Sequence, residues 1–359
     1  MKQLRWGKGR RAGRAVTVLV ALASLLALGG LGGCTGDDAG GGASPGAATS
    51  GTAAGGASAS PGQDGTAGGP DLIQVAALKG PTTMGLVQLM SSSAGLYEFT
   101  VAGTADEITP GLVSGDIDIA LIPANLASVL YNKTDGQVQV AAICVLGVLH
   151  VMTKGVEVES LADLADQTVW STGKGTTPQY VFEYLLDQAG LSDQVTVEYV
   201  SQADEVAAKL TTEAKGIGVL PEPYATVVAG QDDAITEALD LTEVWDKVSP
   251  DSPLVTGVVV VRKGFVDDRP GDFAAFLAAF KSSTEFTNEH HALAGQLIAA
   301  QGITPNATVA ADAIDGAHIV YIDGTDAKTA IAAYLDVLYA ANPESVGGTV
   351  PDDAFYYAG

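Results

Sequence analysis

The sequence predicts an α/β fold of two lobes joined by two crossover strands, and two repeated patterns support this. A strand-length apolar run, a Gly- and Thr-rich turn and a helical pattern follow one another at 72–90, and a counterpart of this pattern follows at 170–189. Two apolar strand patterns, 138–152 and 251–262, are longer than one sheet usually requires. Each can carry the chain from one lobe into the other, so the sequence predicts two βα units and two crossings.

The first strand–turn–helix begins with the apolar run 72–78 and is interrupted by Gly80-Pro81. Thr82 or Thr83 can cap the helix that follows. In open α/β folds, small ligands bind at the carboxyl ends of the strands, where backbone N–H groups and hydroxyls gather. We therefore expect Thr82 and Thr83 to contact a ligand, and the alternative is that they only cap the helix.

A second strand end of the same unit follows the apolar run 117–122, which stops at Pro123 and leads into a helical pattern. Asn125 lies at this turn, at the same level as the two threonines. Its side-chain amide can hydrogen-bond a ligand, and the alternative is again a helix cap. Thr256 lies near the return crossing, and we expect it to contact the ligand as well.

In the second unit, a strand pattern ends in the turn 171–178, and a helical pattern runs from there to a closing Gly190. We expect four residues of this turn to contact the ligand, namely Lys174, Gly175, Thr176 and Thr177. The turn is no phosphate-binding loop, because its spacing lacks the first glycine and Gly175 follows Lys174 where Ser or Thr is needed. Glu222, between two prolines at the end of the pattern 216–220, is a further candidate, or it fixes the turn.

The amino-terminal region predicts export and lipid anchoring. Residues 1–14 hold six basic residues and no acidic one, and an uncharged apolar run follows up to Leu31. The sequence Leu31-Gly32-Gly33-Cys34 resembles the lipobox of bacterial lipoproteins, in which the cysteine carries the lipid. We therefore expect a signal peptide at 1–33, lipidation at Cys34, and a disordered Gly/Ala/Ser-rich tether at 34–70.

The composition excludes several classes of function. The chain has 18 basic and 42 acidic residues and a net charge of −24, which makes nucleic-acid binding improbable. No spacing links the four histidines into a metal site, and we expect neither a metal nor a cofactor. The predicted folded part, 71–359, has no Gly-x-Ser-x-Gly turn, no Cys–His pair near a turn and no clustered acid–base set. We therefore expect that the protein is not an enzyme.

The order of lipobox, tether, two βα units and two crossings resembles the solute-binding lipoproteins of ABC importers. More narrowly, the chain resembles the nitrate/sulfonate/taurine group, which has the type II periplasmic-binding fold and includes binders of thiamine precursors. The resemblance covers about 71–359. It rests on four stretches: 80–85 (GPTTMG), 115–125 (GDIDIALIPAN), Glu222-Pro223 and 351–357 (PDDAFYY).

This resemblance implies that two lobes close on a small solute by a hinge at the crossings. Lobe 1 would comprise 71–148 and 257–359, and lobe 2 would comprise 149–256. The closed form would deliver the solute to a membrane permease that a separate ATPase drives. The protein would be a monomer on the outer face of the cytoplasmic membrane, held there through the lipid on Cys34.

The chemistry of the solute stays open at this point. Helix N-termini with Lys174 nearby favour an anionic group such as a sulfonate or a carboxylate. Glu222 can instead hydrogen-bond an amino or pyrimidine group. The alternatives are therefore a thiamine-precursor binder, an enzyme of the related fold, and a ligand-sensing lipoprotein that feeds no transporter.

Overall fold

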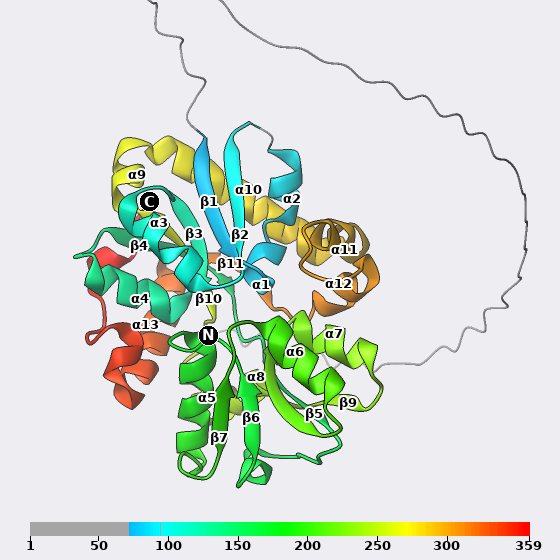
Figure 1. Cartoon of the computed structure of the whole chain (residues 1–359). Coiled ribbons are helices and arrows are strands. Elements are labelled where there is room, and N and C mark those ends of the chain that lie inside the picture. Colours follow the sequence, from blue (N-terminus) through cyan, green and yellow to red (C-terminus); the bar gives the residue numbers. More distant parts are fainter. Residues whose placement is uncertain (1–71, 94) are drawn as a thin grey trace, which may run out of the picture. The chain divides into compact units, whose positions relative to one another are not determined.

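The computed structural model describes residues 72–93 and 95–359, which form two lobes (Figure 1). The predicted signal peptide, the lipidation site Cys34 and the predicted tether lie outside the described residues. Within the described residues, every helix is too short or too polar to cross a membrane. We call the part built on a six-stranded sheet lobe A and the part built on a five-stranded sheet lobe B.

The sheet of lobe A has the strand order β11-β4-β10-β3-β1-β2. Its strands are β1 (Ile73–Leu78), β2 (Tyr97–Ala102), β3 (Ile119–Pro123), β4 (Val138–Val145), β10 (Gly257–Arg262) and β11 (Ile319–Asp323). β1 pairs in parallel with β2 and β3, whereas β10 runs antiparallel to β3 and β4. The carboxyl ends of β1, β2 and β3 therefore meet at one edge of this sheet.

The sheet of lobe B has the order β7-β6-β8-β5-β9. Its strands are β5 (Leu149–Lys154), β6 (Thr168–Ser171), β7 (Thr196–Tyr199), β8 (Gly216–Pro221) and β9 (Ile235–Asp240). β6 is parallel to β7 and β8, and β5 is antiparallel to β8 and β9. In lobe A, β1 lies between β2 and β3, and the antiparallel β10 lies beside β3. In lobe B, β6 lies in the same way between β7 and β8, and the antiparallel β5 lies beside β8. The predicted α/β fold of two lobes is confirmed.

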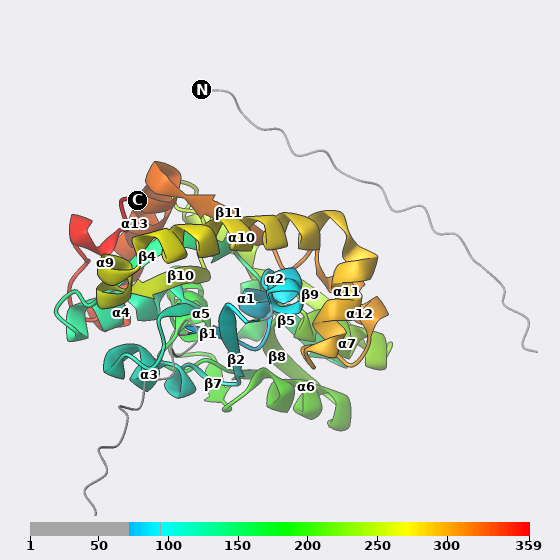
Figure 2. The same cartoon turned by 90° about the horizontal axis from the view of Figure 1, so that it is seen from above.

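Helices cover both faces of the lobe A sheet. They are α1 (Pro81–Met84), α2 (Val87–Ser92), η1 (Ala105–Glu107), α3 (Thr109–Ser114), α4 (Ala124–Lys133), α9 (Lys263–Asp268), α10 (Pro270–Glu289), α11 (His291–Ala300), α12 (Ala307–Ala313), α13 (Gly324–Ala341), η3 (Pro343–Val346) and η4 (Asp353–Phe355). Ile119 and Leu121 of β3 pack in the cluster that holds Phe276 and Phe280 of α10, which runs along one face (Figure 2). Ala120 and Ile122 pack in a separate cluster with α4 and α13, because alternate residues of a strand face opposite sides of the sheet.

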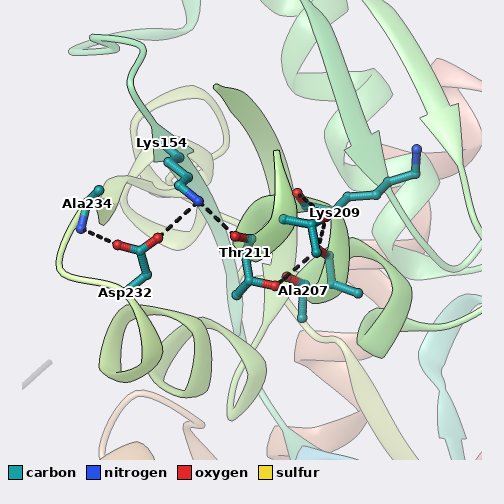
Figure 3. Close-up of polar contacts among 8 residues, drawn as sticks. Lys154, Ala207, Lys209, Thr211, Asp232 and Ala234 are labelled. Carbon is teal, nitrogen blue, oxygen red and sulfur yellow. Dashed lines mark hydrogen bonds and ion pairs between the residues drawn. The ribbon is translucent and has the colours of Figure 1, made fainter. Parts of the chain in front are cut away.

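Lobe B has the elements η2 (Leu161–Leu164), α5 (Thr177–Gln188), α6 (Ala203–Thr212), α7 (Tyr224–Gln231) and α8 (Leu241–Val248). The carboxyl end of α6 is fixed by Lys154 of β5, whose Nζ lies 2.8 Å from the carbonyl oxygen of Thr211 and 2.9 Å from Asp232 Oδ2 (Figure 3). Asp232 also accepts a 2.9 Å bond from Ala234 N. These contacts fix α6 against β5, while its opposite end faces lobe A.

The crossings differ in detail from the two long strands that the sequence predicts. The pattern 138–152 forms β4 and β5 with a break at 146–148, and only the second half of 251–262 is a strand. The break is required because β4 and β5 belong to different sheets, so the backbone must turn between them. Thr256 ties the crossings together, since its N–H donates to Val145 O over 3.1 Å and its hydroxyl donates to Leu146 O. The predicted limits of the lobes, at 148/149 and 256/257, stay a prediction.

The helix caps that the sequence offers as alternatives at Thr82, Thr83 and Asn125 are not found. The N-cap of α1 is Gly80, with φ 131° and ψ −145°, and Pro81 opens the helix. Thr82 and Thr83 therefore lie inside the first turn rather than at its cap, because proline is favoured at the first helical position and glycine alone tolerates this backbone geometry. Asn125 likewise lies inside α4, whose N-cap is Pro123.

Candidate functional site

A cavity of about 390 Å³ lies between the lobes and is lined by both. Lobe A contributes the ends of β1 and β3 and the segment 103–106 after β2. Lobe B contributes the turn after β6, the segment 200–203 after β7, and Pro221 with Tyr224 after β8. Every parallel strand of both sheets thus ends at this cavity, which is the location where α/β folds bind ligands.

Lys79 supplies the positive charge of the lobe A wall. Its backbone N–H donates to Ala102 O over 2.8 Å, which joins the turns after β1 and β2. Its ammonium lies 3.2 Å from Asp204 Oδ2 of α6 in lobe B. Next to it, Thr104 and Glu107 fix η1, since Thr104 N donates to Glu107 Oε1 over 2.9 Å.

The lobe B wall presents Lys174 at the tip of the turn after β6. Gly173 and Gly175 on either side have φ values of 72° and 80°, which glycine adopts without strain. Thr176 Oγ1 donates to Gly173 O over 2.7 Å, and Gly175 N donates to Gln179 Oε1 over 2.6 Å. With the turn fixed in this way, the exposed Lys174 ammonium makes no hydrogen bond or ion pair with any described residue.

Two helices direct their N-termini towards the cavity. Thr176 is the N-cap of α5 and Gln202 is the N-cap of α6, and both line the cavity wall. The backbone dipoles of a helix give its N-terminus a partial positive charge. Tyr224 also lines the wall, and burial together with the nearby Asp204 raises the pKa of its phenol, so the hydroxyl stays neutral.

Of the residues that the sequence predicts as ligand contacts, Lys174 and Thr176 line the cavity. Thr82 and Thr83 are buried and lie outside the lining residues. Their hydroxyls donate to the same carbonyl oxygen, Leu78 O, over 2.7 and 2.6 Å. Their role as ligand contacts stays a prediction.

Asn125, Gly175 and Thr177 come together beside the cavity rather than in its lining. Thr177 Oγ1 of lobe B donates to Asn125 Oδ1 of lobe A over 3.1 Å. Asn125 Nδ2 donates to Ser345 O over 2.9 Å and lies 3.5 Å from Gly175 O. These bonds join the two lobes, and Asn125 and Thr177 are both buried at this contact. Binding of a ligand by these residues stays a prediction.

Glu222 and Thr256 also lie outside the lining residues. Glu222 is buried, and its carboxylate accepts bonds from Thr226 N over 3.2 Å and from Thr226 Oγ1 over 2.9 Å. Burial raises the pKa of Glu222. Gly316 of lobe A packs so closely that an added Cβ would lie 3.0 Å from Glu222 Oε1. Thr256 lies within the crossings, and ligand binding by either residue stays a prediction.

Sequence reasoning missed part of the wall, notably Lys79, the segment 103–106 and Gln202. The rule that selected the turns after 78 and 171 also applies to the strand patterns that end at 102 and 200. The sequence carries strand patterns at 97–102 and 195–200, so their carboxyl ends were available as candidates. Lys79 directly follows the first apolar run and carries a charge, which is the signal that could have identified it.

No known family model matches the sequence, and comparison with curated proteins finds no match either. Solved structures do match. A protein described as an ABC transporter from Parabacteroides distasonis is 22% identical, with a TM-score of 0.67, over 80% of this chain and 98% of its own. The fold is that of the periplasmic binding proteins.

Two further structures share this periplasmic-binding fold. The periplasmic aliphatic sulphonate binding protein SsuA of Escherichia coli is 16% identical, with a TM-score of 0.62, over 80% of this chain and 96% of its own. The CA3427 gene product of Candida albicans is 15% identical, with a TM-score of 0.55, over 79% of this chain and 93% of its own. At these identities the likeness shows the fold, and the function must be argued from the site.

Proposed function

We propose that the protein is the extracytoplasmic solute-binding component of an ABC importer and that it captures a small organic anion, such as a sulfonate or carboxylate, between its lobes. The observation that carries this proposal is the cavity that the strand ends of both lobes line. A solute in this position contacts both lobes at once, so its binding energy favours the closed arrangement. The shared fold with transport proteins supports the same reading.

The charges of the wall favour an anion. Each lobe supplies one lysine, Lys79 and Lys174, and the lining residues include one carboxylate, that of Asp106. The N-termini of α5 and α6 add partial positive charge at the same place. Hydrogen bonds from charged donors to an anionic oxygen contribute about 1.5–3 kcal/mol each, which is enough to select for charge.

The size and the apolar surface of the cavity fit a small organic molecule. A volume of about 390 Å³ is near the lower end of the range for small-molecule sites, roughly 300–1,000 Å³. Leu78, Val200 and the ring of Tyr224 supply apolar surface beside the lysines. This combination suits an anionic head with a short alkyl or aryl part.

The remaining alternatives receive less support. Recognition of an amino or pyrimidine group would use Glu222, but its carboxylate is buried, bonded to Thr226 and outside the lining residues. An enzyme would need an acid–base or nucleophilic set, and the lining residues include no histidine or cysteine. We therefore favour binding over catalysis and an anion over a pyrimidine.

The cellular part of the proposal rests on the amino-terminal sequence. A lipid on Cys34 would hold the protein on the outer face of the cytoplasmic membrane, and the tether at 34–70 would let the lobes reach a permease with its ATPase. We propose a monomer that needs no cofactor. If transport is the role, deletion of the gene abolishes uptake of the bound solute, whereas unchanged uptake in the deletion strain points to sensing.

Binding is tested by thermal-shift and calorimetric screening of sulfonates, carboxylates, nitrate and pyrimidines. A ligand at 100 times its Kd stabilises the fold by about 2.7 kcal/mol, which raises the Tm measurably. Replacement of Lys174 by Met should weaken binding of the anion about tenfold, by removing one charge-assisted bond. Lys133→Met, at the end of α4, is the matched control, because Lys133 lies outside the cavity lining.

The proposal fails if no anion of the panel raises the Tm of the wild-type protein. The claim that Lys174 binds the anion fails if Lys174→Met and Lys133→Met bind the best anion equally well. A pyrimidine as the only hit would favour the thiamine-precursor alternative.

A further inference from the structure

An ion pair joins the two lobes at the edge of the proposed anion site. Lys79 Nζ, which follows β1 in lobe A, lies 3.2 Å from Asp204 Oδ2, which lies in the first turn of α6 in lobe B. The two residues are far apart in the sequence, and their side chains are 30% and 52% exposed. Among the described residues, Asp204 is the acidic side chain that pairs with Lys79. The cavity lysine of lobe A is therefore already neutralised by a carboxylate of lobe B.

Asp204 occupies a place where an anionic ligand would also be stabilised. It directly follows Gln202 and Ala203, which line the cavity, and it lies at the N-terminus of α6, where the helix dipole favours negative charge. It is also close enough to Tyr224 of the wall to raise the pKa of that phenol, after the larger effect of burial. Asp204 thus supplies an anion at the wall from within the chain.

We propose that Asp204 is a built-in competitor for the solute: its carboxylate holds Lys79 until an anionic ligand takes its place, and this exchange sets the affinity and selectivity of the site. The inference rests on the proposed binding of an anion and adds the residue that tunes it. In lobe B, Lys174 has no such partner among the described residues, so the two cavity lysines differ in their availability to a ligand.

The exchange is physically easy for an anion and gives no advantage to a neutral solute. Because the Lys79–Asp204 pair is half exposed, solvent screens it and it contributes little to stability. An anionic head between the lobes lies beside two lysines of the lining, Lys79 and Lys174, and near the positive N-termini of α5 and α6. A neutral molecule of the same shape cannot replace the carboxylate, so Lys79 stays paired and the neutral molecule binds without its help.

The test compares variants of the full-length protein with ethanesulfonate as probe and ethyl methyl sulfone as its neutral counterpart, both by calorimetry. Asp204→Asn should tighten ethanesulfonate binding about 2- to 5-fold, the range set by a half-exposed ion pair. It should leave sulfone binding unchanged. Asp204→Glu keeps a carboxylate within reach of Lys79 and should restore the wild-type affinity.

Two further variants distinguish the direct ion pair of Asp204 with Lys79 from the general effect of negative charge at the start of α6. Glu205→Gln removes the neighbouring acidic residue of the same helix turn, which makes no ion pair with Lys79, and should change the affinity less than Asp204→Asn. In a Lys79→Met background, Asp204→Asn should have no larger effect than Glu205→Gln, because Asp204 acts through Lys79. The Tm of each variant without ligand shows whether it is folded.

The outcomes are distinguishable from those of the proposed function. If wild-type protein binds ethanesulfonate and Asp204→Asn binds it equally well or more weakly, the proposal that Asp204 competes with the solute is overturned, while anion binding stands. Weaker binding by Asp204→Asn would show instead that the Lys79–Asp204 ion pair stabilises the closed form. If Asp204→Asn gains ethanesulfonate binding that the wild type lacks, the competitor is supported. If neither protein binds this or any other anion of the screening panel, the proposed function fails and the inference fails with it.

Discussion

The turn after β1 and the turn after β6 occupy equivalent places in two sheets of the same strand order, yet they use their side chains differently. In lobe A, the hydroxyls of Thr82 and Thr83 fold back onto Leu78 O, and the turn is closed by its own hydrogen bonds. In lobe B, Thr176 Oγ1 likewise donates within its turn, to Gly173 O, yet Thr176 and Lys174 line the cavity. Equivalent topology therefore fixes where a turn lies, while the residue that reaches the cavity depends on the local hydrogen bonds.

The lobes nevertheless present similar chemistry, because Lys79 reaches the cavity from just before the lobe A turn. Each lobe thus contributes one lysine, held beside a glycine of positive φ, namely Gly80 in lobe A and Gly173 or Gly175 in lobe B. Three sets of substitutions test whether the two turns differ in this way.

The largest effect is expected for Asn125→Ala, which removes the bond that ties the lobe B turn to lobe A. Thr177 Oγ1 and Ser345 O would each lose a buried partner, so the free energy of unfolding should fall by roughly 2–4 kcal/mol. Urea denaturation measures this. Asn132→Ala is the matched control, since Asn132 of the same helix bonds Val346 O and Thr349 O within lobe A. Equal losses in the two variants would contradict a special role for the contact between lobes.

A smaller effect should distinguish the glycines of the two turns. Gly80 has φ 131° and ψ −145°, which strains any other residue, so Gly80→Ala should cost about 2–3 kcal/mol even though its Cβ has room. Gly175 has φ 80° with no atom within 4 Å of an added Cβ, and Gly175→Ala should cost about 1–2 kcal/mol. A larger loss for Gly175→Ala, by the same denaturation measurement, would show that the lobe B turn is the more constrained one.

The smallest effect is expected for Thr83→Val, an almost isosteric change in the lobe A turn. Leu78 O keeps the bond from Thr82, so the stability should fall by only about 0.5–1.5 kcal/mol. Calorimetry with the best anion from the screen then decides the remaining sequence prediction. A clear loss of affinity with little loss of stability would place the Thr83 hydroxyl at the ligand and remove the difference between the two turns.

Much of the fold could be predicted from the sequence where hydrophobic patterns are strong. The sequence carries helical patterns at 307–313 and at 203–212, and these form α12 (Ala307–Ala313) and α6 (Ala203–Thr212). The strands β9 and β11 and the helix α8 were missed. β9 and β11 lie at the edges of their sheets. β9 (ITEALD) carries a weak hydrophobic pattern, whereas β11 (IVYID) is a short apolar run between two helical segments, which periodicity alone does not identify as a strand.

The location of the candidate site, at the carboxyl ends of the parallel strands, could also be predicted, but the side chains that line it could not. The rule of strand ends identified the turns of both lobes, because alternating βα patterns predict parallel strands whose carboxyl ends meet at one edge of the sheet. It gave no information on whether a hydroxyl turns outward or back onto the backbone. Thr82 and Thr83 bond within the turn, whereas Lys79, one residue before Gly80, reaches the cavity. Such choices depend on hydrogen bonds that form only in the folded chain.

The neighbouring strands β4 and β10 have a consequence for the order in which the molecule assembles. Val145 and Gly257 are register partners in an antiparallel pair, so the whole of lobe B is inserted in the loop of what is otherwise a hairpin. Closing a loop of this length as an unfolded chain costs conformational entropy, which delays the pairing of its ends. A lobe B that folds first brings residues 145 and 257 together and shortens the effective loop. We therefore expect the pairing of β4 with β10 to follow the folding of the inserted lobe.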